Sequence, residues 1–272
     1  MLSTPKTGKI TCVERKVKMS LKRKRSININ LNGLNSLHRR KNQRITEEKR
    51  RKMFDAVIFD WDGTLADTKH VLINSFQQVL KEIGCNVNDD FIDRRIGIGS
   101  RNLFKDVLKD AKIPFDEEVI DKLVKEKTKR HIELIKNINL FEGTRELLNF
   151  LKNKVKMALA TMGNKRVIDL LLIEKDVRKY FDVVITFDEV KKPKPDPEIF
   201  LKSAMELKCQ PERCVVLEDS IFGVIAAKKA DMKCIAVLSG AYSKEELEKE
   251  KPDLIVNSIN EKKKILDFIK SY

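Results

Sequence analysis

The sequence lacks the features that mark secreted, zinc-binding and membrane-spanning proteins. Its five cysteines form no C-x-x-C pair and no histidine cluster accompanies them, so they predict reduced thiols rather than disulfides or a zinc site. No apolar run approaches the ~20 residues that a membrane-spanning helix needs. No apolar signal-peptide core follows the basic N-terminus. Walker and G-x-G-x-x-G phosphate loops are also missing. These absences favour a cytoplasmic chain.

The positive charge is concentrated at one end of the chain. Residues 1–52 hold 17 Lys/Arg against three acidic residues, a net charge of +14, and the remainder holds 39 against 38, a net charge of +1. A nearly neutral body gives no reason to expect nucleic acid as its partner. With 272 residues and 42% hydrophobic content, the chain predicts one large domain or a domain with an insert.

Residues 1–52 are basic and short of periodic apolar residues, which is typical of a disordered extension. Three interpretations stay open. The segment could be an organellar transit peptide, or a basic arm for nucleic acid or another anionic surface. It could also precede a mis-assigned start. We favour the last, because Met53 stands just before the first expected strand.

From Met53 onward, apolar β-branched runs alternate with segments of helical periodicity. Such alternation predicts an α/β fold with a doubly wound, Rossmann-like parallel sheet. No strand signal appears between about residues 66 and 154, so an all-helical cap is expected at 67–145, inserted into a core of 53–66 and 146–272. The expected strands are 57–59, 155–161, 181–186, 214–218, 233–238 and 253–256, and the expected helices are 68–84, 89–95, 100–111, 116–136, 164–173, 196–207, 220–230 and 260–270.

Two aspartates, Asp60 and Asp62, follow the first expected strand directly. Ligands of open α/β sheets bind beyond the carboxyl ends of the strands. Alternation along an extended chain turns both carboxylates to one side. Two such neighbours need a shared proton or a cation, and Mg²⁺ suits carboxylate oxygens. A solvated acidic turn is the simpler alternative.

Polar residues also follow three later strands. Thr161, with the amides of Met162 and Gly163 at the start of a helix, could bind an anion, although a threonine here could equally be a helix N-cap. Lys192 lies in a proline-stiffened loop that fixes where a lysine points, although a surface lysine is the ordinary alternative. The acidic pair Glu218-Asp219 offers further ligands for a cation.

Taken in order, these residues resemble the motifs of the haloacid dehalogenase superfamily of phosphohydrolases. Asp60-Trp61-Asp62-Gly63-Thr64 is similar to its D-x-D-G-T, and Lys192-Pro193-Lys194-Pro195-Asp196 to its K-P-x-P-D. Thr161 and Glu218-Asp219 are similar to the second and fourth motifs. The resemblance covers residue 54 to the end and implies the helical cap that some members carry.

The resemblance also implies roles for these residues. Asp60 would be the nucleophile that forms an aspartyl-phosphate, and Asp62 the general acid and base. The Mg²⁺ ion would be held by the Asp60 side chain, the backbone carbonyl of Asp62 and Asp219, with Glu218 in or near the layer of residues behind these ligands. The phosphate would be bound by Thr161, Met162, Gly163 and Lys192.

The cap segment 94–101 resembles that of phosphoglycolate-phosphatase-like enzymes, so Arg95 or Arg101 is expected to meet a substrate carboxylate or sugar group. An inter-helix turn with solvated arginines is the alternative. The expected partner is therefore a small phosphomonoester, phosphoglycolate or a sugar phosphate, bound by a monomer or homodimer.

A β-phosphoglucomutase-type enzyme is the second candidate, but the histidine usual in that group falls at Leu72 here, with His70 two residues away. A nucleic-acid or partner-binding module built on the basic arm is the non-enzymatic alternative.

Overall fold

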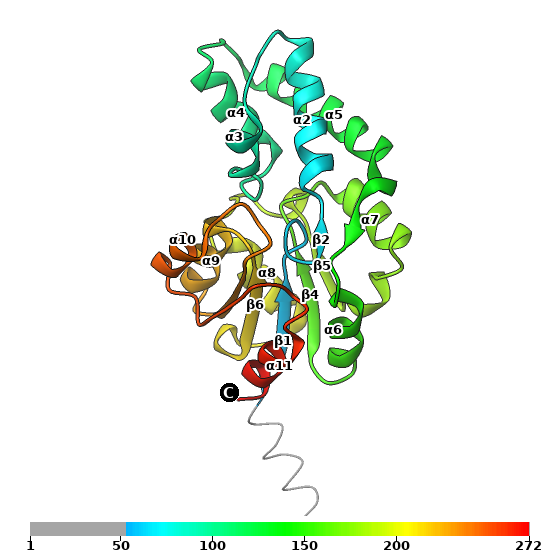
Figure 1. The fold of residues 1–272 in the computed structure, drawn as a ribbon, viewed down its shortest axis with the longest axis vertical. Helices are drawn as coiled ribbons and strands as arrows, with labels where there is room; N and C mark the ends of the chain where they lie inside the picture. The colour runs from blue at the N-terminus through cyan, green and yellow to red at the C-terminus, as the bar shows by residue number, and fades with distance from the viewer. Residues whose placement is uncertain (1–52, 272) are drawn as a thin grey trace, which may run out of the picture. The chain divides into compact units, whose positions relative to one another are not determined.

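The computed structural model describes residues 53–271 (Figure 1). Every expectation for residues 1–52 therefore lies outside the described part of the chain. No helix among the described residues is long and apolar enough to cross a membrane.

A six-stranded parallel sheet with the order β5-β4-β1-β6-β7-β8 forms the core. Counted along the chain, its strands stand in the order 3-2-1-4-5-6, the doubly wound arrangement expected from the sequence. The central strand, β1, carries the residues just before the two aspartates. The strands are β1 Ala56–Phe59, β4 Lys156–Ala160, β5 Val183–Ile185, β6 Cys214–Glu218, β7 Lys233–Val237 and β8 Leu254–Val256.

Alternate residues of each strand bury themselves against helices on opposite faces of the sheet. On β1, Val57 and Phe59 contribute to one core cluster, with α6 (Thr144–Leu151), α7 (Lys165–Glu174) and α11 (Lys262–Lys270). Ile58 contributes to the other, with α8 (Glu198–Leu207), α9 (Ile221–Lys229) and α10 (Lys244–Lys249). Burial on both faces explains why the strands are continuous apolar runs.

The chain between β1 and α6 forms the cap, which extends beyond one end of the sheet in Figure 1. It contains α2 (Lys69–Glu82), α3 (Asp89–Asp93), α4 (Ser100–Asp110) and α5 (Glu117–Glu133), with a separate hydrophobic cluster around Phe76 and Phe104. Helix α2 packs along α5.

The expectation of no strand between 66 and 154 was wrong in one detail. The chain leaves the core through β2 (Ala66–Asp67) and returns through β3 (Asn139–Leu140), which pair as a two-stranded antiparallel ribbon. Strands of two residues are too short to show an alternating pattern. The ribbon ties the two connections between core and cap together at their base.

Candidate active site

The sheet register brings the motif residues to one edge. Phe59 of β1 is paired with Leu159 of β4 and Leu217 of β6, so the residues that follow them emerge side by side. Those residues are Asp60, Ala160 and Glu218, and one step further along lie Thr161 and Asp219. Since β1 is the central strand, where the strand order reverses, this is the place where open α/β sheets bind ligands.

Lys194 is the lysine that reaches this edge. Its Nζ donates hydrogen bonds to Asp60 Oδ1 and Glu218 Oε1, both at 2.6 Å, and to the Ala160 carbonyl oxygen at 3.3 Å. The side chain is fully buried. Burial alone would favour the neutral amine, but the Asp60 and Glu218 carboxylates raise the pKa of Lys194, so it is a cation. One ammonium group thus joins the ends of three strands.

The structure places Lys194 at this edge rather than Lys192, the lysine predicted from the sequence to bind phosphate. The Lys192 side chain is 73% exposed, with Nζ 3.8 Å from Asp196, and its amide donates to the Glu198 carboxylate at the surface. The loop contains the pattern Lys-Pro-x-Pro-acid twice, beginning at Lys192 and again at Lys194. Only the second copy places its lysine where the chain passes beneath the strand ends.

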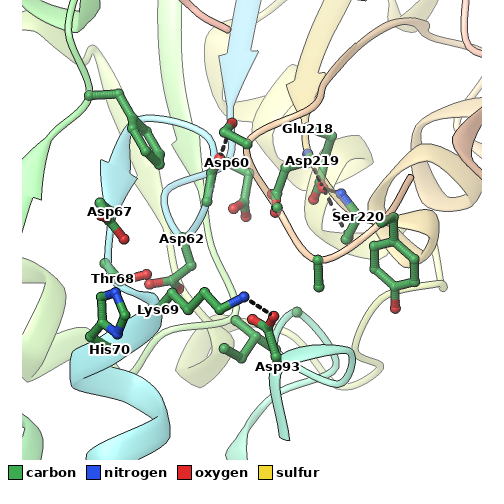
Figure 2. A pocket seen from close by; sticks show the side chains of 18 residues that line it. Asp60, Asp62, Asp67, Thr68, Lys69, His70, Asp93, Glu218, Asp219 and Ser220 are labelled. Carbon is green, nitrogen blue, oxygen red and sulfur yellow. Dashed lines mark hydrogen bonds and ion pairs between the residues drawn. The ribbon is translucent and has the colours of Figure 1, made fainter. Parts of the chain in front are cut away.

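Asp60 and Asp219 are buried carboxyl groups that face the same space (Figure 2). Burial raises the pKa of Asp60 well above its usual range, against the opposing pull of Lys194. Burial and the nearby Glu218 and Asp60 carboxylates do the same for Asp219. The ionised form of each group is therefore penalised where it lies, and a bound cation would relieve that penalty.

Tight contacts fix the Asp219 carboxylate. Thr64 Oγ1 donates to its Oδ1 at 3.0 Å. A Cβ atom at Gly63 would lie 2.2 Å from Asp219 Oδ2, and one at Gly240 would lie 2.1 Å away. Gly63 also has a φ of +77°, a conformation that other residues adopt only under strain. The two glycines form a cradle that no larger residue would leave open.

Glu218 has both carboxylate oxygens occupied. Oε1 accepts from Lys194, and Oε2 accepts from the amides of Asp219 and Ser220 and from the Ser220 hydroxyl, each at 2.9 Å. Ser220 is also the N-cap of α9, accepting from the Gly223 amide. Glu218 therefore orients Lys194 and the start of α9, and is less free than Asp60 or Asp219 to bind a metal ion.

Asp62 stands at the boundary of two cavities. Burial raises its pKa, while hydrogen bonds from Thr68 and Thr161 and the charges of Lys127 and Lys194 oppose that shift. A carboxyl group with a raised pKa retains its proton to higher pH, as a general acid requires. The geometry is thus compatible with the role expected of Asp62.

Thr161 is fully buried, and its Oγ1 accepts a hydrogen bond of 3.0 Å from the Gly163 amide. It is not the N-cap of α7: that position belongs to Asn164, whose side chain accepts from the Arg166 amide. The simpler interpretation of Thr161 is therefore excluded. Met162 and Gly163 line the cavity beside Asp62, as a phosphate-binding turn would.

Two adjoining cavities of about 210 Å³ each lie between cap and core. The first holds Asp60, Asp62 and Asp219 and is bounded by the cap residues Asp93 and Gly97 and the core segment 239–242. Figure 2 shows Asp93 paired with Lys69 on the cap side of this cavity. The second cavity lies between the turn at 162–164 and the inner face of the cap. The cavities share Asp62, Ile96 and Gly97.

The predicted cap arginines line the second cavity, but both have partners. Arg101 pairs with Glu117 and Asp121 on α5. Arg95 lies 3.5 Å from the centroid of the Phe91 ring and donates to the Phe91 carbonyl oxygen. Their contact with a substrate stays a prediction.

The sequence analysis missed Lys127 and His131, which point from α5 into the same cavity region. Both are nearly fully buried, and Lys127 has no ion pair among those found in residues 53–271. Its Nζ lies 3.4 Å from His131 Nδ1 and 4.8 Å from the Phe76 ring centroid. Burial lowers the pKa of Lys127 to about 8, although Asp62 attracts the charged form. The sequence did contain a signal for Lys127: it falls on the same face of the expected helix as the apolar residues Ile120 and Leu123.

No group of three or more His, Cys, Asp or Glu side chains that could hold a metal ion occurs between residues 53 and 271. The ligand set expected from the motifs needs fewer, because it combines the Asp60 and Asp219 side chains with the backbone carbonyl of Asp62.

Comparison with known proteins identifies the family. The model of haloacid dehalogenase-like hydrolases matches residues 57–237. The phosphorylated carbohydrates phosphatase of Thermotoga maritima is 38% identical over 182 residues, 66% of this chain and 83% of that protein.

Two solved structures share the fold. A β-phosphoglucomutase from Clostridium difficile is 27% identical with a TM-score of 0.72, covering 80% of this chain and 97% of its own. A mutant of CbbY from Rhodobacter sphaeroides, in complex with xylulose-(1,5)bisphosphate, is 28% identical with a TM-score of 0.69, covering 77% and 96%.

The chain belongs to the haloacid dehalogenase-like hydrolases. This confirms the expected fold class and the expected enzyme class, a phosphatase of this family.

Proposed function

We propose that this enzyme hydrolyses a small phosphorylated metabolite through a phosphoryl group carried transiently on Asp60. The observation that carries the proposal is the placement of Asp60. Its Oδ1 is held at 2.6 Å by the buried Lys194, while Asp62 lies two residues away in the same cavity. A carboxylate oriented by a fixed cation, with a second carboxyl group near the leaving oxygen, is suited to nucleophilic displacement at phosphorus.

In the first step, an Asp60 carboxylate oxygen attacks phosphorus as the bond from phosphorus to the ester oxygen breaks. Asp62 gives its proton to the departing alcohol oxygen. In the second step, Asp62 takes a proton from water, which attacks the acyl phosphate and releases inorganic phosphate and free Asp60. Lys194, the Thr161 hydroxyl and the amides of the 162–163 turn would stabilise the charge on the non-bridging oxygens.

The acidic groups of the site fit a magnesium ion. Asp60 and Asp219 are buried, and burial together with the Glu218 and Asp60 carboxylates raises the pKa of Asp219. The Gly63–Gly240 cradle keeps Asp219 in one place. Hard oxygen ligands of this kind suit Mg²⁺. We propose that Asp60, Asp219 and the Asp62 carbonyl oxygen hold it, with Glu218 orienting Lys194 beside them. When bound, the ion offsets negative charge so that an anionic nucleophile can approach an anionic phosphate.

The second cavity suggests the class of substrate. Lys127, which has no ion pair among residues 53–271, gives its cap side a positive charge that the paired Arg95 and Arg101 do not offer freely, and this favours a metabolite with a carboxylate, a further phosphate or several hydroxyl groups. Phosphoglycolate and sugar phosphates both meet this description. The carbohydrate phosphatase relative supports the sugar phosphates.

A phosphomutase is the second candidate, favoured by the likeness to β-phosphoglucomutase. One feature of the site argues against it. Leu72, at the position where that group usually has a histidine, lines the second cavity, whereas His70 is exposed at the first. No imidazole of α2 is therefore available beside Lys127 and Asp62 to direct phosphoryl transfer to a second hydroxyl.

The test is release of inorganic phosphate from a panel of phosphomonoesters by the purified enzyme, with Mg²⁺ and with EDTA. We expect Mg²⁺-dependent release from phosphoglycolate or sugar phosphates. Asp60→Asn should abolish release while leaving the fold intact by circular dichroism. Full activity in Asp60→Asn would remove Asp60 as the nucleophile, and isomerisation of β-glucose 1-phosphate without net phosphate release would establish the mutase.

A further inference from the structure

The cap touches the core at a second place, away from the β2–β3 ribbon. Arg94, which ends α3, pairs with Glu246 of α10, with 2.6 Å between Nη2 and Oε1. The Arg94 guanidinium also lies 4.8 Å from the centroid of the Tyr242 ring. In addition, the Tyr242 hydroxyl donates a hydrogen bond to the Arg94 carbonyl oxygen. Two core side chains thus hold the side chain and the backbone of one cap residue.

The core side of this contact is held in place by contacts within the core itself. Tyr242 is 9% exposed and packs edge-on against Phe222. Glu246 belongs to a capping box in which its carboxylate accepts from the Ser243 amide and the Ser243 hydroxyl accepts from the Glu246 amide. Leu247 next to it is fully buried in the core. Because Tyr242 and Glu246 have so little conformational freedom to lose, they can fix the position of Arg94 at small entropic cost.

The contact lies beside the catalytic cavity. The residues next to Arg94 along the chain, Asp93 and Gly97 among them, form the cap wall of the first cavity. On the cap side Asp93 is itself tied to Lys69 of α2. At Gly97, with a φ of +103°, an added Cβ would approach Ser220 Oγ to 3.4 Å, so cap and core meet closely here. A shift of segment 93–97 would open the space above Asp60 and Asp219 to water.

We propose that Tyr242 and Glu246 are positioning residues that seat cap segment 93–97 over the catalytic aspartates by holding Arg94. Neither needs to contact the phosphate. They hold Arg94, and Arg94 in turn fixes the position of the cavity wall formed by segment 93–97. The consequence of this positioning for turnover rests on the phosphatase function proposed above. Seating this wall excludes bulk water from the reacting groups and completes the substrate enclosure.

The first measurement does not depend on activity. Hydrogen exchange of the amides of residues 93–97 is compared between the wild type, Glu246→Gln and Tyr242→Phe. Gln can still accept the Ser243 hydrogen bond, and Phe keeps the ring, so both variants retain the core packing. We expect exchange to rise roughly fivefold in each, the change that corresponds to loss of one partly exposed ion pair or hydrogen bond. Glu245→Gln, one residue away and without a cap partner among the ion pairs of residues 53–271, is the matched control and should exchange as the wild type does.

The second measurement is steady-state phosphate release. Glu246→Gln and Tyr242→Phe should raise KM several-fold more than they lower kcat, and Glu245→Gln should change neither. Exchanging the charges, Arg94→Glu with Glu246→Arg, should restore both exchange and KM towards the wild type. Unchanged exchange at 93–97 in both single variants would overturn the proposal, and so would raised exchange with unaltered kinetic constants.

If the wild type released no phosphate from any ester, the proposed function would fail. The exchange measurement would still decide whether Tyr242 and Glu246 seat the segment.

Discussion

At the scale of single residues, the site is organised by one buried cation between two buried carboxylates. Lys194 donates hydrogen bonds to Asp60, Glu218 and the Ala160 carbonyl oxygen, and so links the ends of three strands. Removing one partner of such a group leaves the others charged and unpaired in a medium that cannot solvate them. Lys194 is therefore expected to matter for both stability and turnover.

Lys194→Met should lower phosphate release at least about a hundredfold, the effect of losing a group that stabilises the transition state. It should also lower the free energy of unfolding by about 3–5 kcal/mol, because Asp60 and Glu218 lose their counter-ion. Urea unfolding and phosphate release measure the two effects. Lys192→Met is the matched control, with a side chain that is 73% exposed, and should alter neither. The reverse pattern would restore Lys192 as the site lysine.

The sequence predicted the location of the other motif residues better than that of this lysine, for a physical reason. Asp60, Thr161 and Glu218 each follow an apolar strand, and parallel strands end at a common edge, so their proximity follows from the fold class. A loop has no such constraint. The overlapping patterns at 192 and 194 both read Lys-Pro-x-Pro-acid, and the first, which ends in aspartate, fits K-P-x-P-D better. Only the packing of the loop shows that Lys194 is the buried lysine.

At the scale of elements, α5 places a lysine on its buried face. Lys127 is in register with the buried Ile120, Leu123 and His131, and neutral His131 contacts its Nζ. Burial lowers the pKa of Lys127 from 10.5 to about 8. In the unfolded chain the same group has an ordinary pKa, so the folded state bears the full cost of burying the ammonium below pH 8. That cost disappears as the pH rises from about 8 to 10.5.

Lys127→Met should therefore stabilise the fold at pH 7, by on the order of 3 kcal/mol from the charge alone. The gain should shrink between pH 8 and 10.5, where the wild type loses the proton in the folded state. Urea unfolding at pH 7 and pH 9.5 measures the difference. Lys129→Met, on the exposed side of α5, should show no such pH dependence. An equal gain at both pH values would mean that the Lys127 ammonium is not penalised by burial.

The elements that the sequence analysis missed are all short. The helices α6 and α10 have eight and six residues, and β2 and β3 have two each. Periodicity over so few residues is weak, although Leu147, Leu148 and Leu151 of α6 do fall on one face. The long helices of the cap and the buried strands were predicted within a few residues of their observed ends. Tertiary contacts rather than local pattern decide the short elements, and α10 owes its importance to one such contact, between Glu246 and Arg94.

At the scale of the whole molecule, charge and catalysis are separated along the chain. Residues 1–52 carry a net charge of +14, whereas the rest carries +1 and holds every proposed site residue. We therefore expect the chemistry of the enzyme to depend on the residues from Met53 onward.

A chain that begins at Met53 should therefore keep the kcat and KM of the full chain for its phosphomonoester substrate, and the midpoint of its thermal unfolding should move little. Binding of polyanions such as DNA or heparin should instead be lost with residues 1–52, and in the full chain it should weaken steeply with added salt, because it depends on counter-ion release. Asp60→Asn in the full chain should leave that binding unchanged, which separates the two properties. Loss of phosphatase activity in the shortened chain, with its fold intact, would show that the basic segment contributes to the site.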